Sequence, residues 1–177
     1  DWKDHFSLVL FLGGCDLKCP TCHDFELAWQ PQSMDTLPKE PLLKYISERA
    51  YFLDGIVVTG GEPSIAPDLL DFLAELGEIG LPIKLDSNGM NPHVLEEVLE
   101  RKLVKAFSVD VKGPWHKYPV LTGDRVSAQD AEHRLNHIFD LARHNPDTFM
   151  FRTTQVPYLN AADIMKVRTY LPKGHVL

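Results

Sequence analysis

Hydrophobic and polar positions alternate between two patterns along the chain. Short β-branched or apolar runs predict six strands, and the stretches between them carry apolar residues at helical spacing. The predicted strands are Ser7–Leu12, Gly55–Thr59, Pro82–Asp86, Ala106–Val111, Phe149–Val156 and His175–Leu177. The predicted helices are Lys39–Ala50, Pro67–Ile79, Pro92–Glu100, Ala128–Arg143 and Ala161–Leu171. Because parallel neighbours need a crossover, usually a helix, this alternation predicts an α/β fold with parallel strands.

The length and the end of the chain set its expected organisation. The 177 residues suit a single domain over 1–177, since a chain of this size buries enough surface for one core. The longest irregular stretch, Gly113–Ser127, is long enough to predict a working loop. Leu177 falls inside the last predicted strand, so we expect the C-terminus to be truncated relative to the natural chain.

Composition and charge exclude several classes of partner. A hydrophobic content of 44% with 24% charged residues is typical of an ordered globular protein. The net charge of −7 gives no general attraction to nucleic acid or to anionic lipid. The sequence shows neither an apolar run of about 20 residues nor the layout of a signal peptide. We therefore expect a cytoplasmic protein without a nucleic-acid or membrane partner.

Unusual polar and glycine-rich groups follow five of the predicted strands. In chain order they are Cys15, Cys19 and Cys22; Gly60, Gly61, Glu62 and Pro63; Asp86, Ser87, Asn88 and Gly89; Asp110 and Lys112; and Pro157. Ligand-binding loops of parallel α/β proteins collect at the carboxyl ends of the strands. The sequence therefore predicts that these groups form one site.

All three cysteines of the chain lie in one short loop, with the spacing Cys-x-x-x-Cys-x-x-Cys. Such a loop can hold a compact, soft metal centre. A [4Fe-4S] cluster needs one ligand for each iron, so three cysteines leave one iron without a protein ligand. An open coordination position is what a metal centre needs to bind and activate a substrate.

Other interpretations of the cysteines stay open at this point. His23 could complete a structural Cys₃His zinc site, although its adjacency to Cys22 makes a shared tetrahedral ion difficult. Residues 19–23 also match the C-x-x-C-H pattern of covalent haem attachment, which requires an exported chain. The thiols could instead be ordinary buried side chains. A zinc or iron–sulfur module without catalytic activity is a further alternative.

With residues 57–63, VVTGGEP, the cysteine loop resembles the radical S-adenosylmethionine (SAM) superfamily. The later stretches LDSNG, DVKG and KYPVLTG are similar to the glycyl-radical-enzyme activating proteins, especially those of anaerobic ribonucleoside-triphosphate reductase. The resemblance implies a partial (β/α)6 TIM-like barrel, a [4Fe-4S] cluster and SAM. It also implies an oxidoreductase that forms a 5′-deoxyadenosyl radical and abstracts hydrogen from a glycine. The implied partners are a glycyl radical enzyme and a flavodoxin or ferredoxin-type electron donor.

The resemblance also implies roles for the SAM-binding residues. The carbonyls of Gly60 and Gly61, with Glu62, would accept hydrogen bonds from the methionyl ammonium. Lys112 would bind the methionyl carboxylate. Alone, the two glycines and the proline after them would more often be a strand-ending turn.

Asp86 and Asp110 are expected on neighbouring strand ends, where two carboxylates repel unless a positive charge lies between them. The resemblance implies a monovalent cation there, with Ser87 and the Ser108 carbonyl as further ligands. Two exposed aspartates, with Lys112 as an ordinary ion-pair partner, are the alternative. Arg152 could reach the nucleotide or the partner, or form an internal ion pair.

One position departs from the family pattern. Most members carry an aromatic residue before the third cysteine, near the adenine, whereas this chain has Thr21. His23 and Phe25 are nearby substitutes for that ring. A second radical SAM function also stays open: action on a small molecule, as in 7-carboxy-7-deazaguanine synthase.

Overall fold

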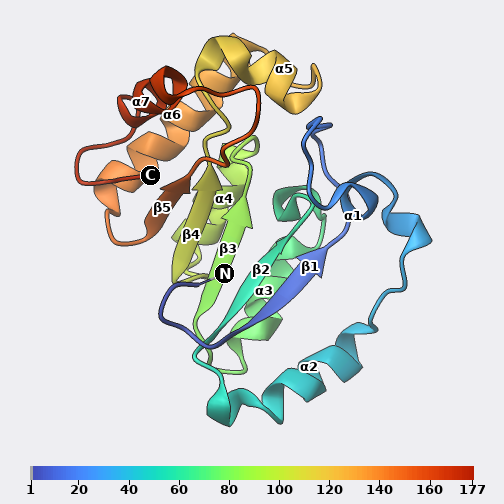
Figure 1. Cartoon of the computed structure of the whole chain (residues 1–177). Coiled ribbons are helices and arrows are strands. Elements are labelled where there is room, and N and C mark those ends of the chain that lie inside the picture. The colour runs from blue at the N-terminus through green and yellow to red at the C-terminus, as the bar shows by residue number, and fades with distance from the viewer. Residues whose placement is uncertain (1) are drawn as a thin grey trace.

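The computed structural model describes residues 2–177 and contains one parallel sheet with helices packed on it (Figure 1). The strands lie side by side in chain order, and every neighbouring pair is parallel. They are β1 (Ser7–Leu12), β2 (Gly55–Gly60), β3 (Ile83–Ser87), β4 (Ala106–Asp110) and β5 (Phe149–Arg152). The predicted α/β class with a parallel sheet is therefore confirmed.

Helices lie between successive strands, as the sequence pattern predicts. The α-helices of the described chain are α1 (Phe25–Trp29), α2 (Lys39–Ser47), α3 (Leu69–Gly77), α4 (Pro92–Glu100), α5 (Tyr118–Thr122), α6 (Ala128–His144) and α7 (Ala161–Arg168). The 3-10 helices are η1 (Pro31–Ser33), η2 (Ala50–Phe52), η3 (Pro63–Ile65) and η4 (Trp115–Lys117). The α4 bounds match the prediction, and those of α2, α3, α6 and α7 differ by one to three residues at one or both ends.

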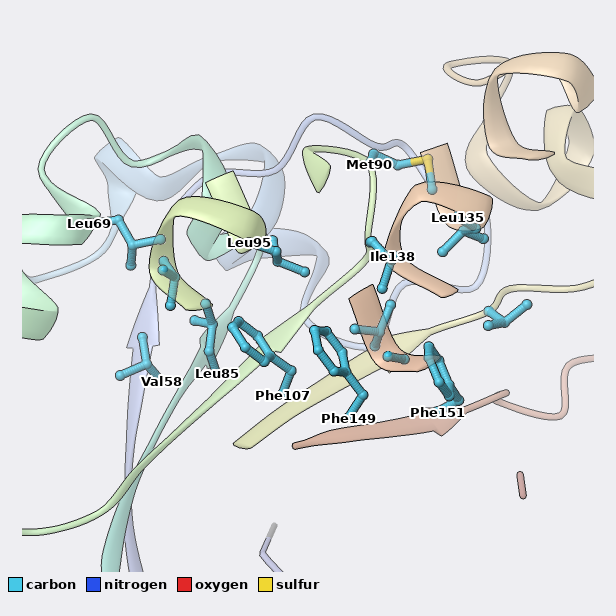
Figure 2. Packing of buried hydrophobic residues seen from close by; sticks show 14 of the residues in the cluster. Val58, Leu69, Leu85, Met90, Leu95, Phe107, Leu135, Ile138, Phe149 and Phe151 are labelled. Carbon is cyan, nitrogen blue, oxygen red and sulfur yellow. The ribbon is translucent and has the colours of Figure 1, made fainter. Parts of the chain in front are cut away.

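Apolar side chains on one face of the sheet pack against α3, α4 and α6 (Figure 2). The register places Val58 beside Leu85, Leu85 beside Phe107, and Phe107 beside Phe149, so one apolar row crosses four strands. The rings of Phe107 and Phe149 stack with their centroids 4.8 Å apart. Full burial of a side chain of this size contributes about 1.5–3 kcal/mol, so this row anchors the helices to the sheet.

The opposite face of the sheet is polar near the carboxyl ends of β3, β4 and β5. Because side chains alternate along a strand, Lys84 and Asp86 share this face, and so do Asp110 and Arg152, which are register partners. Lys84 and Asp86 are both buried. The fold therefore places charged groups next to the ends of three adjacent strands.

Three expectations about the elements are corrected by the structure. The expected sixth strand at 175–177 is not a strand, so the sheet has five strands in the described chain. This short segment follows a turn at Gly174 (φ 94°), and His175 packs on the Phe151 ring instead of pairing with a strand. The stretch 113–127 is not irregular, since it contains η4 and α5. The fifth strand ends at Arg152 instead of Val156.

Within the described residues 2–177, every helix is too short or too polar to cross a lipid bilayer.

Candidate functional site

A cavity of about 270 Å³ lies at the carboxyl ends of the strands. Residues from the loops after all five strands line it. The ten residues to which the sequence analysis gave cluster-binding, cation-binding or SAM-binding roles are among them: Cys15, Cys19, Cys22, Gly60, Gly61, Glu62, Asp86, Ser87, Asp110 and Lys112. Gly89 and Pro157, which the sequence analysis also placed in this site, are not lining residues. The fold thus gathers groups that are spread over nearly 100 residues of sequence into one place.

The cysteine loop is fixed to the rest of the site by hydrogen bonds. The Lys18 amide donates to the Thr122 carbonyl at the end of α5 (3.0 Å). The Asp16 carboxylate accepts from the side-chain amides of Asn88 (2.8 Å) and Asn91 (3.2 Å). The loop between the first two cysteines is therefore tied to the loop after β3.

All three cysteines are free thiols, and each is half-buried. Burial raises the pKa of Cys15 to about 12, and the carboxylates of Asp16 and Glu62 add to this increase. Burial also raises the pKa of Cys19, although the Lys112 ammonium opposes that effect. A positively charged metal centre would reverse the preference for the neutral thiols, because thiolates are the metal-binding form.

The spacing of the thiols bears on the size of that centre. One group of three His, Cys, Asp or Glu side chains in residues 2–177 has all its ligand atoms within 4.8 Å of one another, and this group contains no cysteine. Thiolates on a single zinc ion lie about 2.3 Å from it and hence about 3.8 Å from one another. The three thiols are therefore not all close enough together to share one zinc ion as they stand, which suits a cluster of several metal atoms better than a single ion. The three donors and their cavity fit a [4Fe-4S] cluster.

Gly60 and Gly61 bring the loop after β2 close to the loop after β1. A side chain at Gly61 would place its Cβ 1.9 Å from the Gly14 carbonyl oxygen, and one at Gly60 would lie 2.2 Å from that of Leu12. Gly60 also has a φ of 123°. The Glu62 amide donates to the Gly14 carbonyl (2.8 Å), which joins the two loops. The close approach that these glycines permit is thus between backbone segments of the protein itself.

Glu62 is buried at the centre of the site, and its carboxylate accepts hydrogen bonds from the surrounding chain. The donors are the Ser64 amide (3.0 Å) and hydroxyl (2.5 Å), the Ser87 hydroxyl (2.8 Å) and the Asn88 amide (2.6 Å). Burial raises the pKa of Glu62, while these hydrogen bonds lower it and leave a net increase. Glu62 therefore connects the loop after β2 with the loop after β3.

Five charged side chains form a continuous ion-pair chain across β3, β4 and β5. Lys84 Nζ lies 2.5 Å from Asp86 Oδ1, and Arg152 Nη1 lies 3.0 Å from Asp86 Oδ2. Arg152 Nε lies 2.5 Å from Asp110 Oδ1, and Lys112 Nζ lies 2.7 Å from Asp110 Oδ2. The guanidinium of Arg152 thus bridges the two aspartates, where the family resemblance implied a monovalent cation, and forms the internal ion pair that the sequence analysis left open.

The pKa values in this chain of charges follow from burial and pairing. For Asp110, burial raises the pKa, but Lys112 and Arg152 outweigh it and hold the pKa below its ordinary value. For Lys112, burial lowers the pKa, and the charges of Asp110 and Cys19 outweigh it, so the pKa is raised. Lys112 is therefore a fixed positive charge near Cys19, and Asp110 a fixed negative one.

The sequence did not identify several residues that hold this site together. Lys84 balances Asp86, Asp16 anchors the cysteine loop, and Ser64 and Asn91 extend the hydrogen bonds of Glu62. Lys84 had a usable signal, because it precedes Asp86 by two positions in a strand and so shares its face. Asp16 and Asn91 lie in loops and Ser64 in the short 3-10 helix η3, and how these segments approach one another depends on the whole fold.

The region around the third cysteine contains the expected departure. Thr21 and His23 line the cavity, whereas Phe25 is not among the lining residues and packs on Trp29 (ring centroids 6.0 Å apart). Of the two nearby rings, only that of His23 is at the cavity.

A parallel sheet with three free thiols, a buried carboxylate and fixed charges at its carboxyl edge fits an iron–sulfur protein that binds a further cofactor in the same cavity. The chain belongs to the Radical SAM superfamily, whose family model matches residues 9–171. Membership implies a [4Fe-4S] cluster and SAM, which agrees with the donor set described above.

Relatives with known names fall into two groups. The chain is 34% identical over 158 residues to MJ1227 of Methanocaldococcus jannaschii, which is named as a glycyl-radical enzyme activating enzyme; the match covers 89% of this chain and 64% of that protein. It is 36% identical over 88 residues to the 7-carboxy-7-deazaguanine synthase of Hyperthermus butylicus, covering 49% of this chain and 36% of that enzyme. The chain thus spans less than two thirds of the length of these relatives.

A solved structure supports the fold. The chain is similar to Streptococcus suis SuiB bound to S-adenosylmethionine, with a TM-score of 0.58 and 15% identity over 93% of this chain and 43% of SuiB. At this identity the likeness concerns the fold, a partial barrel of parallel strands.

Proposed function

We propose that this chain is the radical SAM domain, over residues 1–177, of a glycyl-radical-enzyme activase. It would reductively cleave SAM and remove a hydrogen atom from a glycine of a partner glycyl radical enzyme. The observation that carries the proposal is the convergence of three free thiols, the two-glycine loop and Lys112 on one cavity. The relationship to MJ1227 over 89% of this chain favours the activase branch.

Cys15, Cys19 and Cys22 would hold three irons of the cluster, so that the fourth iron is open to SAM. The bound cluster, once reduced, would supply the one electron that breaks a carbon–sulfur bond of SAM, which yields methionine and a 5′-deoxyadenosyl radical. A flavodoxin or ferredoxin-type protein would donate the electron. Asp16 holds the thiol loop in place through Asn88 and Asn91.

The SAM-binding residues would act through backbone and charge. The carbonyls of Gly60 and Gly61 are suited to the methionyl ammonium, and Lys112 is suited to the methionyl carboxylate. Because the Glu62 carboxylate already accepts four hydrogen bonds from the chain, its main contribution would be to position the loops after β2 and β3.

The charges at the strand ends would orient SAM without a bound cation. Asp86 and Asp110 share the guanidinium of Arg152, so we assign the neutralising charge to this arginine in place of a monovalent cation. Ser87 would act through Glu62, to which its hydroxyl donates.

The partner and the location follow from the activase proposal. A radical formed at this cavity must meet a glycine delivered from outside, since the hydrogen donor is another protein. The proposed setting is the cytoplasm, where the thiols stay reduced and available to iron.

A second candidate is a small-molecule radical SAM enzyme, which the 36% identity to the 7-carboxy-7-deazaguanine synthase of Hyperthermus butylicus favours. It shares the thiol loop and SAM with the first candidate and differs in the origin of the hydrogen atom. A metal-binding module without catalytic activity would bind metal and leave SAM intact.

One experiment separates these candidates. The anaerobically reconstituted protein is mixed with SAM, a reductant and a candidate glycyl radical enzyme, and the EPR spectrum is recorded. A glycyl-radical doublet that depends on Cys22 supports the activase. Cleavage of SAM without a doublet in any plausible partner would contradict it and favour a small substrate, whereas zinc content without cleavage indicates the module.

A further inference from the structure

Away from the cavity, helices α4 and α6 pack side by side and share a cluster of metal-ligating side chains. His93 and Glu96 belong to α4, and His137 belongs to α6. Their ligand atoms all lie within 4.8 Å of one another, which holds for no other three His, Cys, Asp or Glu residues in positions 2–177. Glu96 Oε2 lies 3.1 Å from His137 Nε2 and 3.7 Å from His93 Nδ1.

The helical spacing places these groups along the line where α4 packs on α6, called the seam below. His93 and Glu96 are three residues apart, and residues at this spacing are neighbours on a helix surface. On α6, four residues at helical spacing share a face: His133, His137, Asp140 and His144. These four and Glu96 line one surface hollow. The seam thus collects imidazoles and carboxylates from both helices.

The donors have the chemistry and the spacing of a metal site. Two imidazoles and one carboxylate are a known zinc donor set, in which water completes the coordination. Donors at about 2.0–2.1 Å from a tetrahedral ion lie about 3.3 Å apart, close to the 3.1 and 3.7 Å found here. Neutral imidazole and carboxylate donors favour late first-row ions over Mg²⁺ or Ca²⁺. We propose that His93, Glu96 and His137 bind a divalent transition-metal ion, Zn²⁺, with water at the remaining position.

This position would connect the metal with the loop after β3. Helix α4 begins directly after Asn91, whose side chain donates to Asp16, and Asn88 of the same loop donates to Glu62. Arg134 of α6 already donates to the Met90 carbonyl in the same loop (2.8 Å). A metal ion held by His93 and Glu96 near the start of α4 and by His137 of α6 would add a second link between these helices. The role of the ion would be structural, because it would stabilise the loop after β3 that supports the cavity.

The test uses the full chain with Cys15, Cys19 and Cys22 replaced by serine, so that Zn²⁺ cannot bind at the thiols. ZnCl₂ is titrated by calorimetry into this parent, into its His93→Ala and His137→Ala variants, and into a His5→Ala control. The side chain of His93 is 84% exposed, so removing it leaves the packing intact. His5 lies in the N-terminal segment, where its ring stacks on Trp2.

We expect one Zn²⁺ per chain in the parent and the His5→Ala control, and at least tenfold weaker binding in both seam variants. Free Zn²⁺ at a hundred times the Kd of the parent should raise the Tm of the parent by about 5 °C or more, and raise that of the His93→Ala and His137→Ala variants by no more than about half as much. Equal affinity in parent and seam variants would overturn the proposal, and so would a parent that binds no Zn²⁺ below millimolar concentration. Neither result depends on SAM chemistry, so this proposal fails or stands separately from the proposed function.

Discussion

At the scale of single residues, Cys15 shows that the protein alone does not favour the thiolate form that binds metal. Burial raises its pKa to about 12, and the nearby charges of Asp16, Glu62 and Cys19 act in the same direction. Cys19, in contrast, lies close enough to Lys112 for the ammonium to oppose its increase. Cys15 is therefore a neutral thiol near neutral pH, and a bound positive centre would favour its thiolate form.

This predicts slow alkylation of Cys15 in the reduced, metal-free protein. A thiol with a pKa of about 12 in place of 9 has about a thousandfold less thiolate at pH 8, and thiolate is the reactive form. Iodoacetamide labelling followed by peptide mass spectrometry should find Cys15 modified far more slowly in the folded chain than in urea. Because the pKa of Cys15 is higher in the folded chain, its neutral thiol contributes its full share of the folding stability below about pH 9, and this share is lost as the pH rises toward 12. Equal labelling rates in the folded and unfolded chain would refute this.

Gly61 supports a steric prediction with a matched control. Gly61→Ala places a Cβ 1.9 Å from the Gly14 carbonyl oxygen, so the loops after β1 and β2 must separate. We expect a loss of about 1–3 kcal/mol in unfolding free energy and weaker iron loading. Gly77→Ala, at the end of α3 with nothing within 4 Å, should be neutral or gain up to about 1 kcal/mol. Urea denaturation of both variants checks this, and a harmless Gly61→Ala would show that the close contact is dispensable.

At the scale of elements, the alternation of strands and helices was predictable because each strand and each helix has its own spacing of apolar residues along the sequence. Val58, Leu85 and Phe107 lie in separate apolar runs, and the register brings them together against α4 and α6. The short helix α5 was missed, because Tyr118–Thr122 begins next to Pro119 in a stretch with glycine at both sides. The sixth strand was wrongly predicted, because three residues of apolar pattern do not guarantee a strand partner.

The ends of β3, β4 and β5 are held together by Arg152, which pairs with Asp86 and Asp110. Arg152→Gln leaves the two carboxylates facing each other and should cost about 1–2 kcal/mol, a moderate value because the side chain is 46% exposed. The same variant should gain stability when choline chloride is replaced by KCl, since a cation can then fill the gap. Thermal melts in the two salts measure both effects; a K⁺ response in the unmodified chain would contradict our assignment to Arg152.

The lowered pKa of Asp110 fixes the sign of an acid effect. Its ion pairs contribute stability above its unfolded pKa of 3.8, and the contribution is lost as the pH falls through the lower folded pKa. The difference in Tm between the unmodified chain and Asp110→Asn should therefore be constant from pH 7 to about pH 5. It should shrink below about pH 4. A difference that grows on acidification would rule out this account of Asp110.

At the scale of the whole molecule, the location of the site was predictable, whereas the hydrogen-bond and ion-pair partners within it were not. Polar and glycine-rich groups after successive strands imply one site once the sheet is parallel, and residues of the first four predicted groups line the cavity, whereas Pro157 of the fifth does not. The partners of those residues depend on distances that no local pattern encodes. The pairing of Arg152 with both Asp86 and Asp110 illustrates this, because Arg152 lies 42 positions beyond Asp110 in the chain.

The central claim is that three thiols hold a cluster whose open iron binds and cleaves SAM. It is tested by measuring 5′-deoxyadenosine formed from SAM by the anaerobically reconstituted, chemically reduced protein, beside a Cys22→Ala control. The account predicts product that requires the reductant and is absent in the control. Iron- and sulfide-loaded protein that binds SAM and forms no 5′-deoxyadenosine under these conditions would contradict it.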